Sequence, residues 1–155
     1  MKKWYSFSLI IILSLVQVSY LVAQNKNKIS SQYVGIWESS FTNINVRSKT
    51  GFFKWKFISG SVKIILQIND DNFASGKIGN SEFKSASIKK NRGIGISYII
   101  DCGEVGKLFE NDPEEKKSLQ LWLIPINEND TLRAELRLSS SDKYPMGEFK
   151  LFRKN

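Results

Sequence analysis

The sequence predicts an all-β protein, an antiparallel meander that closes into a barrel of about 8–10 strands. Three observations predict it. Apolar residues alternate with polar ones from Tyr33 onward, turn residues separate these segments at regular spacing, and no segment has the period of a long helix. Most connections are short enough for hairpins, so consecutive strands should pair. A barrel is favoured over a sandwich because closure removes unpaired strand edges.

A segment with the pattern of a signal peptide precedes the strands. Two lysines stand before an apolar run, and Ala23 offers a small residue at a cleavage site. We expect residues 1–23 to be removed on export to the periplasm or the extracellular space, which leaves no membrane span. Retention as a membrane anchor is the alternative, although polar residues dilute the run below the roughly 20 apolar residues of a span. Residues 24–32 are expected to form a flexible lead-in to a single barrel domain, residues 33–155.

The first half of the domain contains five alternating segments. The first two segments place these residues on one face each: Tyr33, Gly35, Trp37, Ser39 and Phe41, and then Phe53, Trp55 and Phe57. Thr42–Gly51 is expected to be a loop between them, and Ser59-Gly60-Ser61 a turn after them. The third segment has the apolar face Val62, Ile64, Leu66 and Ile68. Turns at Asn69–Asn72 and Gly79-Asn80 bound the next two, Phe73–Ile78 and Glu82–Lys89.

The second half continues the same period. The next strand has one apolar face, made of Ile94, Ile96, Tyr98, Ile100 and Cys102. Phe109–Lys117 is acidic and is expected to be a solvated loop. The following strand places Leu119, Leu121 and Leu123 on one face and Trp122 on the other. Leu132–Leu138 alternates with charged residues, which is typical of a strand with one solvated face. A loop at Ser139–Met146 leads to the last strand, which carries Phe149, Leu151 and Arg153.

Residue counts exclude several chemistries. The chain has no histidine, which removes Ser-His and Cys-His nucleophile pairs and histidine-ligated metals. Cys102 is the only cysteine, so it can form no intramolecular disulfide; its apolar context predicts burial, and pairing between chains is the alternative. The acidic turn and loop match no calcium loop, and nothing places Asp101 and Glu104 in a glycosidase cleft. We therefore expect no metal, no cofactor and no enzymatic activity.

The positive net charge is only weak evidence for an anionic binding partner. The formal charge is +8, and it falls by two, to +6, when Lys2 and Lys3 leave with the signal peptide. The basic residues are scattered, and the densest run, Lys89-Lys90-Asn91-Arg92, is short. We expect this charge to serve solubility, and we expect no nucleic-acid partner.

Gly35-Ile36-Trp37 in the first strand, the meander that follows, and a basic residue in the last strand resemble the calycin group, which comprises lipocalins, fatty-acid-binding proteins and avidins. The resemblance implies that Trp37 closes one barrel end and that Arg153 packs across its indole, with Gly35 allowing close backbone approach. Such a cation–π contact contributes about 0.5–2 kcal/mol. Thr42–Gly51 is too short for the two helices of fatty-acid-binding proteins, and neither a lipocalin-type helix after the barrel nor avidin's biotin pattern is evident. The resemblance therefore implies a fold and no ligand.

Aromatic side chains are the main candidates for function. Five of them are candidate lining residues of a barrel cavity: Phe53, Trp55, Phe57, Tyr98 and Trp122. This predicts an exported, non-catalytic protein that binds a small hydrophobic or amphipathic ligand. The alternative is a barrel with a filled core that binds a protein partner, as an inhibitor or envelope-associated module, through Thr42–Gly51, Phe109–Lys117 and Ser139–Met146.

Overall fold

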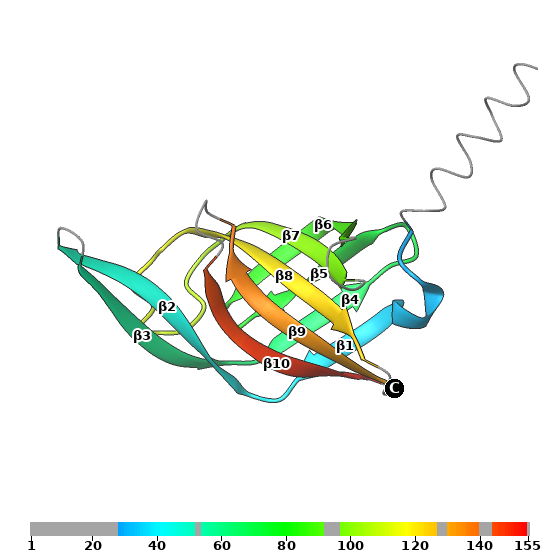
Figure 1. Cartoon of the computed structure of the whole chain (residues 1–155), viewed down its shortest axis with the longest axis horizontal. Coiled ribbons are helices and arrows are strands. Elements are labelled where there is room, and N and C mark those ends of the chain that lie inside the picture. The colour runs from blue at the N-terminus through cyan, green and yellow to red at the C-terminus, as the bar shows by residue number, and fades with distance from the viewer. Residues whose placement is uncertain (1–27, 52–53, 92–96, 127–129, 140–143, 155) are drawn as a thin grey trace, which may run out of the picture.

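The structure, a computed structural model, describes residues 28–51, 54–91, 97–126, 130–139 and 144–154. These residues form a short 3-10 turn, Ser31–Tyr33, and ten strands. The strands are β1 (Gly35–Ser39), β2 (Thr42–Gly51), β3 (Lys54–Val62), β4 (Ile64–Ile68), β5 (Phe73–Ile78), β6 (Ser81–Asn91), β7 (Ser97–Val105), β8 (Lys117–Pro125), β9 (Thr131–Leu138) and β10 (Pro145–Arg153). Eight strands form a closed antiparallel barrel, and β2 and β3 form a separate two-stranded sheet (Figure 1). The predicted all-β barrel is confirmed.

The barrel is a meander that its first strand closes. Strands β4 to β10 pair in sequence order, and β1 pairs with both β4 and β10. Trp37 in β1 is opposite Leu66 on one side and Arg153 on the other. The β2–β3 hairpin is inserted between β1 and β4, and Figure 1 shows it extending from one end of the barrel, away from the C-terminus.

The inserted hairpin corrects two predictions. Thr42–Gly51 is a strand and not a loop, and Ser59-Gly60-Ser61 lies within β3 and is not a turn. Ile44 and Val46 are both fully buried, so one face of β2 is held by apolar packing despite its polar composition. A Cβ at Gly60 would collide with the Phe109 ring. Glycine at this position therefore serves close side-chain packing rather than chain reversal.

The expected tight turns after β4 and β5 are present. Asn72 has a φ of 67° and Gly79 a φ of 57°, the left-handed backbone that asparagine and glycine tolerate best. Asn72 also accepts a hydrogen bond of 2.7 Å through Oδ1 from the backbone N–H of Ile29. Ile29 is buried, so ordered contacts begin within the segment predicted to be a flexible lead-in. Ile94 and Ile96, assigned to the next strand from the sequence, lie outside the described residues.

Aliphatic side chains fill the barrel interior. Among the described barrel residues, eight leucine and isoleucine side chains have an exposed fraction of 0%: Ile64, Leu66, Ile78, Ile100, Leu119, Leu121, Leu136 and Leu151. A side chain with no surface accessible to water borders no void that could hold a water molecule. Cys102 is buried among them as predicted, and this burial, more than the nearby Asp101, raises the pKa of its thiol to about 12. The interior around these residues is therefore apolar and close-packed.

Trp37 closes one end of the barrel. Its side chain is 2% exposed, and its indole N–H donates a 2.9 Å hydrogen bond to the carbonyl of Tyr33. The guanidinium carbon of Arg153 lies 4.5 Å from the centre of the Trp37 ring. Arg153 also donates to the carbonyls of Gln32 and Val34 and to the carboxylate of Asp130. One arginine thus joins the last strand to the segment that leads into the first.

Gly35 makes this arrangement possible in two ways. Its φ is +139°, a conformation that side chains disfavour. A Cβ at this position would lie 2.8 Å from Nη1 of Arg153. Glycine at position 35 therefore permits an unusual backbone conformation and leaves room for Arg153, which covers the Trp37 indole.

We predict that Gly35→Ala destabilises the protein by about 2–3 kcal/mol, because it adds backbone strain and displaces Arg153. Gly103→Ala is the matched control, since Gly103 has a φ of 68° but a Cβ there would meet nothing within 4 Å. The control should cost about 1 kcal/mol from strain alone. Urea unfolding measures both, and equal losses would show that the contact with Arg153 is not what selects glycine at position 35.

Candidate functional site

The aromatic residues predicted to line a cavity do not gather in one place. Tyr98 is buried in the interior at the Trp37 end, where its ring meets that of Tyr33 edge-on at a centroid distance of 5.5 Å. Trp122 alternates with the buried Leu121 and Leu123, so it lies on the outer face, where the Arg137 guanidinium carbon is 4.1 Å from its ring centre. The prediction that Trp122 lines the interior is wrong, because its two neighbours occupy that side.

Two of the other three candidates, Trp55 and Phe57, belong to the inserted hairpin. Phe57 is 51% exposed in β3, outside the barrel sheet, so it does not line the interior. Trp55 is paired with Lys49 in the β2–β3 register. Phe53 lies outside the described residues. Period-two alternation identified the faces of strands, but it could not show that this pair of strands leaves the barrel.

The three segments predicted to carry contacts meet at one end of the barrel. We call this the hairpin end: the β2–β3 hairpin, the segment Phe109–Lys117 and the residues at Tyr144–Met146. The rings of Phe57 and Tyr144 stack with centroids 5.5 Å apart and planes inclined by 25°. The guanidinium carbon of Arg47 lies 6.0 Å from the Tyr144 ring centre. The hairpin therefore contacts Tyr144 through Phe57 and Arg47, and it contacts the Phe109 ring at Gly60.

The inner side of the hairpin end closes the second end of the barrel. Ile44, Val46 and Val62 at the base of the hairpin are buried, and so are Leu108 and Met146. Their burial anchors the base of the hairpin on the barrel, while Figure 1 shows its far part extending beyond the barrel.

A buried ion pair holds the acidic segment in place, which corrects the prediction of a solvated loop. Nζ of Lys117 lies 2.6 Å from Oδ2 of Asp112, and the two side chains are 2% and 0% exposed. The ammonium also donates to the carbonyl of Glu114 at 2.8 Å. Asp112 accepts backbone hydrogen bonds from Leu108 and Glu114. These additional hydrogen bonds satisfy both buried charges and fix the segment beside the barrel mouth.

The hairpin carries positive charge without counter-charge of its own. Between Thr42 and Val62 the sequence has no acidic residue and four basic ones: Arg47, Lys49, Lys54 and Lys56. Several basic side chains of the barrel lie beside acidic ones. Lys63 and Lys154 both contact Glu38 and lower the pKa of its carboxyl through hydrogen bonds, Lys154 most strongly. The hairpin end thus presents basic and aromatic side chains together.

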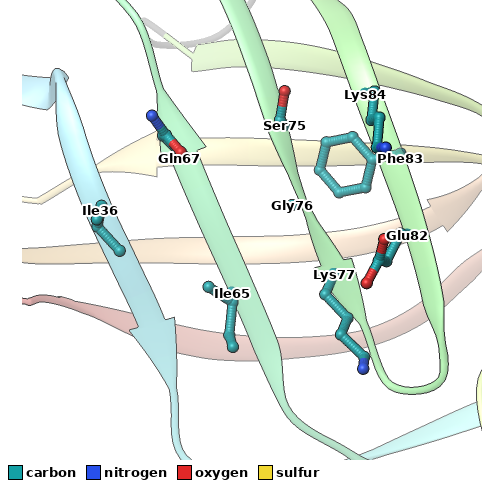
Figure 2. Close-up of a pocket in the computed structure, with 9 residues that line it drawn as sticks. All are labelled: Ile36, Ile65, Gln67, Ser75, Gly76, Lys77, Glu82, Phe83 and Lys84. Carbon is teal, nitrogen blue, oxygen red and sulfur yellow. The ribbon is translucent and has the colours of Figure 1, made fainter.

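A second candidate surface is a groove on the outer face of β1, β4, β5 and β6, with a volume of about 290 Å³ (Figure 2). Ile36, Ile65 and Phe83 provide apolar surface, and Gln67, Ser75 and Lys84 provide polar groups. The groove lies on the barrel wall and does not open into the interior residues described above.

Comparisons with protein-family models, with curated proteins and with solved structures find no match. In the described part of the chain, no three acidic or cysteine side chains are grouped so that they could hold a metal ion. The same residues include no helix with the length and apolar character needed to cross a membrane. The two surfaces above therefore carry the functional argument.

Sequence reasoning missed three of these features. The absence of acidic residues from Thr42 to Val62 is a sequence signal for the basic hairpin. It was not used, because Thr42–Gly51 was predicted to be a loop. Nothing in the local sequence distinguishes Asp112 and Lys117 from the charged residues around them. The groove depends on cross-strand neighbours, which a linear pattern does not reveal.

We predict that Lys117→Met lowers the free energy of unfolding by about 3–5 kcal/mol, because it leaves the Asp112 carboxylate buried without its partner. Lys116→Met is the matched control: Lys116 pairs with Glu104, but their side chains are 77% and 61% exposed. It should change stability by less than about 1 kcal/mol. Chemical denaturation of both variants is the measurement, and a small loss for Lys117→Met would contradict the structural role of the pair.

Proposed function

We propose that this protein is an exported, non-catalytic, lipocalin-like barrel that binds an acidic protein partner through its hairpin end. One observation carries the proposal: the hairpin from Thr42 to Val62 has four basic residues and no acidic one, and it brings Phe57 into a ring stack with Tyr144 of a neighbouring segment. Export is supported by the N-terminal pattern of residues 1–23. The lipocalin-like relationship is supported by the eight-stranded barrel and the stacking of Arg153 on Trp37.

The chemistry of the hairpin end suits protein recognition. Aromatic and arginine side chains are enriched among the residues that contribute most to binding at protein interfaces. Phe57, Tyr144 and Arg47 are held together by ring contacts, so little side-chain entropy would be lost when a partner binds. Excess positive charge accelerates association with an acidic partner and selects against basic ones.

The prediction of an interior ligand stays a prediction, but the geometry favours the alternative. Both barrel ends are covered, one by Trp37 and Arg153 and the other by the base of the hairpin. The aliphatic side chains between them have no water-accessible surface. An interior ligand would therefore require repacking of the core, whereas a partner at the hairpin end requires none.

Site-specific photocrosslinking in the native cells tests the proposal. Phe57 is replaced by photoreactive p-benzoylphenylalanine, and the control places the same group at Phe152, which is 45% exposed on the barrel wall. We expect a discrete adduct with an acidic protein from position 57 and none from position 152. Arg47→Glu combined with Lys56→Glu should reduce that adduct at least about five-fold, since both charges are reversed.

The charge control is Lys89→Glu combined with Lys90→Glu, which alters an equal number of charges in β6 and should leave the adduct unchanged. Identical adducts from positions 57 and 152, or an adduct with lipid or nucleic acid alone, would overturn the proposal. Equal loss in both charge variants would show that net charge, and not the hairpin end, governs association.

A further inference from the structure

The outer groove is lined by Gly76 together with the apolar residues Ile36, Ile65 and Phe83. Gly76 in β5 is paired with Leu66 in β4 and with Phe83 in β6. Ring carbons of Phe83 lie 3.0 and 3.1 Å from the position a Cβ would take at Gly76, and the Ile65 carbonyl oxygen is closer still. A side chain at position 76 would collide with these atoms, so glycine lets the largely buried Phe83 ring pack against β5. Phe83, Gly76 and the partly exposed Ile65 line the groove in the barrel wall (Figure 2).

One end of the groove carries hydrogen-bond donors. Gln67 and Ser75 are register partners in β4 and β5. The backbone N–H of Ser85 donates to Oγ of Ser75 at 3.3 Å, which leaves the hydroxyl hydrogen of Ser75 available to a ligand. Lys84 is exposed beside them, and no ion pair to Lys84 is present among the described residues. Figure 2 shows these three side chains along the same end of the groove.

The opposite end of the groove carries one basic and one acidic side chain. Lys77 and Glu82 face each other across β5 and β6, and Figure 2 shows both below Gly76. The carboxylate of Glu82 disfavours a second anionic group there. Ile36 from β1 is 42% exposed and extends the apolar surface on the far side of Ile65. The groove thus has donors at both ends, but only the end with Lys77 also carries a carboxylate, that of Glu82.

We propose that this groove binds a small anionic amphiphile, a single short acyl chain with a carboxylate head. The chain would lie over Ile65, Gly76 and Phe83, and the carboxylate would accept hydrogen bonds from Lys84 and Ser75. The volume of about 290 Å³ is at the lower end of small-molecule sites, which limits the ligand to one short chain. This site is on a different surface from the hairpin end and does not depend on a protein partner.

The test is an NMR titration of the full chain with sodium decanoate, followed through backbone amide shifts. We expect saturable shifts centred on Gly76, Phe83 and Lys84. Decyltrimethylammonium has a chain of the same length and a cationic head, and it should bind at least about ten-fold more weakly because Lys84 repels it. Equal binding of the two amphiphiles would overturn the proposal, and so would the absence of saturable shifts at these amides.

Matched variants separate the groove from general surface effects. Lys84→Gln should weaken decanoate binding about five-fold, the effect of losing one partly solvated charge pair. Ile36→Ser should weaken it about three-fold by removing apolar contact. The controls are Lys89→Gln, exposed on the same strand, and Phe152→Ser, an exposed apolar residue of β10. If the control variants weaken decanoate binding as much as Lys84→Gln and Ile36→Ser do, the site is refuted. Unchanged amide spectra outside the groove verify that each variant is folded.

Discussion

The contact between Arg153 and Trp37 is the interaction on which the rest of the structure depends, because it joins the two strands that meet where the barrel closes. β1 has only five residues, and its register with β10 covers three of them. The guanidinium adds to this short pairing by covering the indole and by donating to two carbonyls of the preceding segment and to Asp130. Gly35 provides the space in which the arginine lies. Without this closure, β4 and β10 would each present an unpaired edge.

Closure at both ends determines where the protein can make contacts. The interior side chains described here pack against one another without water-accessible surface. This packing is the reason that our proposals place contacts with other molecules on the outside of the barrel. The inserted hairpin concentrates positive charge at one end, and a groove lies on the outer wall over β1 and β4 to β6. These two surfaces differ in chemistry, one suited to an acidic macromolecule and the other to a small amphiphile.

The barrel strands could be predicted from the sequence because the side-chain period is a local property. Leu132–Leu138 alternates without interruption, and Leu132, Ala134 and Leu136 are buried as expected, although Glu135 on the charged face is buried too. β2 could not be recognised in this way, since only Ile44 and Val46 mark its buried face among polar neighbours. Alternation also does not show which face of a strand looks inward, as for Trp122, or whether a strand belongs to the barrel sheet at all, as for Phe57. The groove depends on a register shift in β5–β6 between Ala74 and Gly76, which no linear pattern reveals.

A double-mutant cycle tests most directly whether the first and last strands are coupled through this contact. Unfolding free energies are measured for the unaltered chain, for Trp37→Leu, for Arg153→Met and for the double variant. The account predicts that the two substitutions are non-additive, with a coupling energy of about 1–2 kcal/mol. Losses that add within about 0.3 kcal/mol would mean that each residue stabilises the barrel independently, and the proposed closure would be wrong.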